Sequence, residues 1–98
     1  MTEQTDISIR WMSSPELKTT YANHVSITHA GGEFYLTFGE LIPSSPSEEA
    51  PTHVDVIPVA RIAVAPEAML RIAQAINANM QRYKQRLEEQ VLEQENSR

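Results

Sequence analysis

The sequence predicts an α+β domain in which a small antiparallel β-sheet of three main strands is followed by one long C-terminal α-helix. Three observations predict this order. Two stretches of alternating apolar residues flank Gly31-Gly32, a third β-rich stretch runs from Val54 to Ala65, and after Pro66 no glycine or proline occurs. Period-two alternation is typical of strands, and an uninterrupted run of good helix formers is typical of a helix.

The 98 residues are enough for one domain and not for two. We expect a flexible N-terminal segment over residues 1–16, a single β-β-β-α domain over 17–92 and a frayed tail over 93–98. Within the first segment, Ile7, Ile9 and Trp11 alternate with polar residues and could form an additional short strand or an extended segment pinned by the tryptophan. A chain of this size buries only about 65% of the surface that its unfolded form exposes, so a partner would add stability.

The first two strands are predicted over Tyr21–Thr28 and Glu33–Leu41. They form an antiparallel hairpin, because two adjacent glycines can adopt the positive φ values that a tight turn needs. Residues 42–53 hold three prolines, and we interpret them as a mobile surface loop rather than as a proline-rich recognition motif.

The third strand is predicted over Val54–Ala65. It is apolar on both sides, so we expect both of its faces to pack against other parts of the protein or against a partner. Strict alternation places its apolar residues on two faces: Val54, Val56, Ala60, Ile62 and Val64 on one, and Ile57, Val59 and Ala63 on the other. Pro58 lacks an N–H donor, which predicts an edge strand or a bulge.

The helix is predicted from Pro66 to at least Leu92. Proline suits the first helical position, and Glu67 suits the positive end of the helix dipole. The apolar stripe repeats every eleven residues, which is typical of a nearly straight helix. A helix of this length overshoots strands of about eight residues by two turns or more.

The stripe continues into that overhang, which favours packing against a second chain over simple exposure. Arg61 lies in an apolar strand, where an unpaired charge is costly, so it should pair with Asp55, Glu67 or an acid of a partner. The candidate interface residues are Met69, Ile72, Ile76, Met80, Tyr83, Leu87, Val91, Ile57, Val59 and Arg61.

The residue types and their spacing do not indicate a catalytic or metal-binding site. The chain has no cysteine, and His24, His29 and His53 lack the spacing of a metal site. No serine has an oriented base, and no carboxylate pair is placed for acid–base chemistry. We therefore expect no enzymatic activity, no cofactor and no metal.

Charge and hydropathy favour a cytoplasmic protein that does not bind nucleic acid. The formal net charge is −5, and the only basic cluster, Arg82, Lys84 and Arg86, is followed at once by two glutamates. No run of about 18 apolar residues exists, and the N-terminus is polar and acidic, unlike a signal peptide.

Four segments in this order resemble a known family: Leu17–Asn23, Glu33–Gly39, Val59–Pro66 and Asn79–Tyr83. Together they are similar to the small, mostly bacterial proteins known only as domain of unknown function 3467. The resemblance extends from residue 17 to residue 83. It implies a bacterial or phage-like origin and the same β-then-α order, and it supplies no activity.

The Tyr21-Ala22-Asn23 motif within this resemblance has two interpretations. Asn23 could bind a ligand, or its amide could satisfy backbone groups where the strand begins, and the structural role is favoured.

For the whole chain the leading hypothesis is a non-enzymatic homo-oligomer, with a dimer favoured, that serves as a protein-interaction or scaffold module. The alternative is a chaperone or adaptor with the element order of SecB, and nucleic-acid binding ranks below both.

Overall fold

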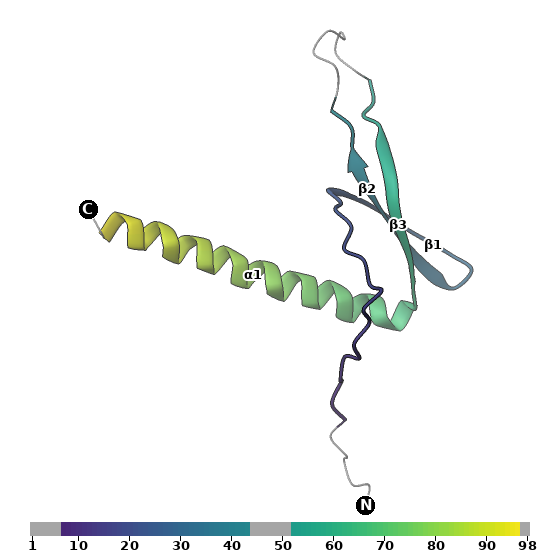
Figure 1. Cartoon of the computed structure of the whole chain (residues 1–98), viewed down its shortest axis with the longest axis horizontal. Coiled ribbons are helices and arrows are strands. Elements are labelled where there is room, and N and C mark those ends of the chain that lie inside the picture. The colour runs from purple at the N-terminus through teal and green to yellow at the C-terminus, as the bar shows by residue number, and fades with distance from the viewer. Residues whose placement is uncertain (1–6, 44–51, 97–98) are drawn as a thin grey trace, which may run out of the picture.

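The structure is a computed structural model that describes residues 7–43 and 52–96. A three-stranded antiparallel sheet is followed by one long helix, so the predicted α+β order is confirmed (Figure 1). The elements are β1 (His24–Ala30), β2 (Glu33–Leu41), β3 (Val56–Val64) and α1 (Pro66–Asn96).

Several predicted boundaries change. The first strand begins at His24 and not at Tyr21, and the third spans Val56–Val64 and not Val54–Ala65. The helix was predicted to extend at least to Leu92, and it continues to Asn96. The possible short strand from Ile7 to Trp11 does not form, and Trp11 does not pin the segment, because it is 91% exposed. Residues 1–6, 97–98 and most of the predicted loop at 42–53 lie outside the described residues.

The hairpin between β1 and β2 is confirmed. Gly31 and Gly32 have φ values of 60° and 85°, which are the positive values of a two-residue type I′ turn. Ala30 pairs with Glu33 on either side of the turn, and the register continues without a break to His24 opposite Gly39. Because this turn twists in the same sense as its strands, it fixes the register of the whole hairpin.

The strand order β1-β2-β3 makes β2 the central strand and leaves β1 and β3 as edges. The register places most of the apolar side chains on one side, which we call the apolar face. It consists of Val25 and Ile27 from β1, Phe34, Leu36 and Phe38 from β2, and Ala60, Ile62 and Val64 from β3. Polar residues such as Ser26, Thr37 and Arg61 share the opposite, polar face.

A β-bulge interrupts the pairing of β2 with β3. Phe38 pairs with Ala60, but the next residue, Gly39, pairs with Pro58, so β3 carries one extra residue, Val59. The prediction of an edge strand or a bulge at Pro58 is thereby confirmed. The bulge also reverses the alternation before it, so Val56 lies on the polar face and its predicted placement with Ala60 is wrong.

Gly39 is the position where this bulge leaves no room for a side chain. A Cβ at Gly39 would collide with Cγ1 of Val56 and would lie 3.1 Å from the carbonyl oxygen of Ile57. We expect Gly39→Ala to lower the free energy of unfolding by about 1–3 kcal/mol, because overpacking forces the backbone to shift. Urea denaturation measures the change. Gly31→Asn is the control, since a Cβ there meets nothing within 4 Å and asparagine tolerates positive φ; equal losses in both variants would contradict the account.

The helix leaves the sheet instead of covering it (Figure 1). It contacts β2 near its own start, where Ala68, Met69 and Ile72 are half-buried, and no described residue of α1 is fully buried. Its 31 residues span roughly 46 Å. The overhang was predicted to be two turns or more, and it is long because the helix projects from the sheet instead of lying along it.

The hydrophobic core of the described residues is correspondingly small. Leu36 and Val64, both on the apolar face, are the only buried hydrophobic side chains there. Most of the folding free energy of a domain comes from apolar burial, and the described residues of a single chain bury little apolar surface.

Candidate functional site

The candidate site is the apolar stripe of α1, and the structure keeps it on one side of a continuous helix. Its first two members, Met69 and Ile72, are half-buried beside β2. Its remaining members are exposed along the overhang: Ile76 58%, Met80 52%, Tyr83 57%, Leu87 44% and Val91 54%. None of these five side chains is covered by the described part of the sheet, so the stripe is the helix's unpartnered face.

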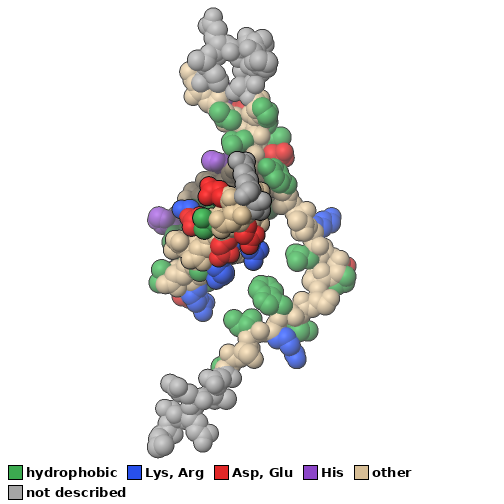
Figure 2. All heavy atoms as spheres, turned by 90° about the vertical axis from the view of Figure 1, so that its left-hand side faces the viewer, with side chains coloured by type: hydrophobic (Ala, Val, Ile, Leu, Met, Phe, Trp, Pro, Cys, Tyr) green, Lys and Arg blue, Asp and Glu red, His purple; other side chains and the backbone are tan. Residues whose placement is uncertain are grey.

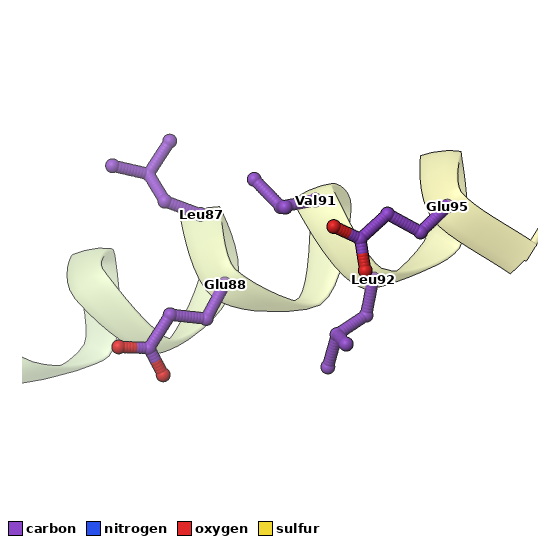
Figure 3. A pocket seen from close by; sticks show the side chains of 5 residues that line it. All are labelled: Leu87, Glu88, Val91, Leu92 and Glu95. Carbon is purple, nitrogen blue, oxygen red and sulfur yellow. The ribbon is translucent and has the colours of Figure 1, made fainter.

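The far end of the helix carries an apolar residue outside the stripe. A shallow hollow there is lined by Leu87, Glu88, Val91, Leu92 and Glu95 (Figure 3). Leu87 and Val91 project from one side of the helix and Leu92 from the other. Leu92 was missed because it falls outside the eleven-residue spacing; its apolar character next to Val91 was the signal that could have found it.

The apolar face of the sheet is the second uncovered surface. Val25, Ile27 and Ile62 are 40%, 55% and 50% exposed, although they flank the buried Leu36 and the half-buried Phe38. Because α1 turns away after its first turns, nothing in the described residues covers the outer strands on this side. The predicted need of the third strand for additional cover therefore applies to the whole face.

The three candidate residues of β3 do not form one surface. Ile57 is exposed and pairs with Glu40, and Val59 is half-buried at the bulge. Arg61 lies on the polar face, where its Nε donates a hydrogen bond of 3.1 Å to Oγ1 of Thr37. The predicted carboxylate partners are not used in this contact. Arg61 thus makes one hydrogen bond to the neighbouring strand, is otherwise exposed to solvent, and is separated from the apolar face by the sheet.

Asn23 has the structural role. Its side-chain Oδ1 accepts a hydrogen bond of 2.8 Å from the backbone N–H of Leu41, and its own N–H donates to the carbonyl oxygen of Gly39 at 3.0 Å. The residue thereby ties the chain before β1 to the end of β2, beyond the last regular pair of the hairpin. This explains why the Tyr-Ala-Asn motif precedes the strand directly.

The described part of the N-terminal segment, residues 7–22, is extended and exposed. Its largest side chain, Trp11, is 91% exposed, and Ile7 and Ile9 are 90% and 88% exposed. A turn at Ser14, whose carbonyl accepts from the N–H of Leu17, bends the segment. The segment runs away from the sheet in Figure 1, where it crosses in front of the helix, and Figure 2 shows that it stands clear of the helix.

Within the described residues, no group of three or more His, Asp or Glu is placed to hold a metal ion. His53 lies 3.7 Å from the carboxylate of Asp55, with both side chains largely exposed. His24 and His29 lie on opposite faces of β1, as their spacing predicted, and His29 stacks at an angle on Phe34.

In the part of the chain described here, no helix combines the length and hydropathy needed to cross a membrane.

These features define a class: a small β-meander with one long projecting helix, in which more of the described large apolar side chains lie on the surface than in the core. A model for the family described as "Protein of unknown function (DUF3467)" matches residues 1–90, and the chain belongs to that family. The match extends beyond the residues 17–83 that carry the sequence resemblance. No curated protein and no solved structure matches the chain.

Proposed function

We propose that this protein is a non-enzymatic, homo-oligomeric protein-interaction module, with the dimer as its basic unit. One observation carries the proposal: α1 presents an apolar stripe along its overhang, while only its first turns contact its own sheet. Large contiguous apolar surface on a small protein marks an interaction site. A second copy supplies the same surface at the same concentration, and twofold pairing of identical patches is the commonest form of oligomer.

The free energy available from burying the stripe supports an interface larger than the stripe alone. Full burial of a large apolar side chain stabilises by about 1.5–3 kcal/mol, and the five exposed stripe residues have about half of that still available. Over two copies this gives about 7–15 kcal/mol, which is comparable with the roughly 4–15 kcal/mol that association costs. The apolar face of the sheet should therefore contribute to the same interface.

Methionine oxidation tests the proposal on the native sequence. Met80 lies in the middle of the stripe, whereas Met12 lies in the exposed N-terminal segment. We expect the rate of Met80 oxidation by dilute peroxide to fall as the protein concentration rises through the dissociation constant, because association removes its sulfur from solvent. Mass spectrometry of peptides gives the two rates. A Met80 rate that is independent of concentration and equal to the Met12 rate would contradict the proposal.

The second candidate is a chaperone or adaptor that binds extended polypeptide segments. The outer edge of β1 favours it, because this strand of seven exposed residues contains no proline or lysine to block the addition of another strand. Suppression of the aggregation of an unfolded substrate by the intact dimer would support this candidate. Its absence at a tenfold excess of protein would remove it and leave the oligomer proposal standing.

A further inference from the structure

Once its first member, Met69, is set aside, the helix stripe has the same spacing in both chain directions. From Ile72 the stripe continues at Ile76, Met80, Tyr83, Leu87 and Val91, with steps of four, four, three, four and four residues. Its midpoint lies between Gln81 and Arg82. A twofold axis at that midpoint, perpendicular to the helix, would map the stripe onto itself, as an interface between identical surfaces requires.

We propose that α1 pairs with α1 of a second copy in antiparallel orientation, with the twofold axis between Gln81 and Arg82. The inference rests on the proposed homo-oligomer and specifies its geometry. Ile72 then packs beside Val91 of the partner, Ile76 beside Leu87 and Met80 beside Tyr83.

Charge favours the antiparallel over the parallel orientation. The last turns of α1 are acidic, with Glu88, Glu89, Glu93 and Glu95, and the last turn contains no basic residue. Figure 2 looks along the helix from this end and shows acidic side chains gathered there. Parallel pairing would bring the two acidic ends and the two negative helix poles together, whereas antiparallel pairing places each beside the positive start of the other helix.

The position of the sheets leads to the same orientation. Each helix meets its own sheet at Met69 and Ile72 and projects away from it. In the antiparallel pair, the last turns of one helix, including Val91, come beside the start of the other and so beside the other sheet, where Ile27 and Ile62 are exposed. Parallel pairing would leave both helix ends projecting from the same side of the dimer, remote from either sheet.

Single-cysteine variants test the orientation without background, because the chain contains no cysteine. Ile76→Cys and Leu87→Cys are purified separately, mixed under reducing conditions and, after removal of the reductant, oxidised with glutathione disulfide, which is reduced to two molecules of glutathione. In an antiparallel pair, residue 76 of one chain lies beside residue 87 of the other, so a disulfide should form between the two variants in the mixture. Few disulfides should form between two copies of the same variant, because the two identical positions are about 16 Å apart along the helix axis. Ala78→Cys with Gln85→Cys is the matched control: these positions are related by the same axis but face away from the stripe, and should not cross-link.

The outcomes separate the two proposals. A disulfide formed mainly between the Ile76→Cys chain and the Leu87→Cys chain, in a mixture whose reduced variants keep the dimeric mass, supports the antiparallel pair. Disulfides mainly between identical chains, or cross-linking of the control pair as fast as the stripe pair, would overturn the orientation and leave the homo-oligomer intact. A monomeric mass for the native protein would overturn both.

Discussion

Leu87→Glu is expected to dissociate the oligomer while leaving the sheet folded. Leu87 is 44% exposed in the single chain, and it lies in the overhang, away from every strand. The substitution removes about 1.5–3 kcal/mol of apolar burial over two copies, and placing two carboxylates in the interface adds at least as much. We expect the dissociation constant to rise roughly 10²- to 10⁴-fold.

Gln85→Glu is the matched control for this experiment. It introduces the same charge two residues away on the same helix, but its side chain points to the opposite side from the stripe. Sedimentation velocity at several concentrations gives the dissociation constants of the native protein and of both variants. If Leu87→Glu and Gln85→Glu weaken association equally, the stripe is not the interface and net charge governs the assembly.

The second large effect is a dependence of thermal stability on protein concentration. Because Leu36 and Val64 are the only buried hydrophobic residues described within one chain, much of the native burial is expected to form between copies. Each tenfold rise in concentration should add about 1.4 kcal/mol per dimer and raise the Tm by about 3–6 °C. Circular dichroism at 222 nm, recorded over about three decades of concentration, measures the shift.

The Leu87→Glu variant provides the contrast within this experiment. Once the chains are separate, its Tm should lie below that of the native dimer and should no longer change with concentration over the same range. A native Tm that stays constant over the whole range would mean that a single chain is stable with its small core. The need for a partner would then disappear.

The hairpin and the start of the helix could be predicted because short-range rules determine them. Gly31-Gly32 supplies the two positive φ values of the turn, and alternation on either side then fixes which residues share a face. Pro66 and Glu67 mark the first turn of α1 at the position where the helix begins. Each of these signals acts within a few residues, so tertiary contacts were not needed to interpret them.

The face of Val56 and the direction of α1 could not be predicted, because each depends on contacts beyond the local sequence. Pro58 indicated a bulge, but the extra residue at Val59 and the reversed alternation follow from the pairing with Gly39. An apolar stripe indicates that a helix packs against other protein. It does not show whether the helix packs on its own sheet or on another chain. Leu92 was missed for a related reason, since it lies outside the regular spacing.

The central claim is that a second copy covers the stripe and the apolar face of the sheet. Sedimentation equilibrium on the native protein at micromolar concentration tests it most directly, because it gives the mass without any assumption about shape. We expect a mass of about twice the 11.0 kDa of one chain, falling to that of one chain on dilution. A mass of 11.0 kDa throughout the micromolar range would contradict it.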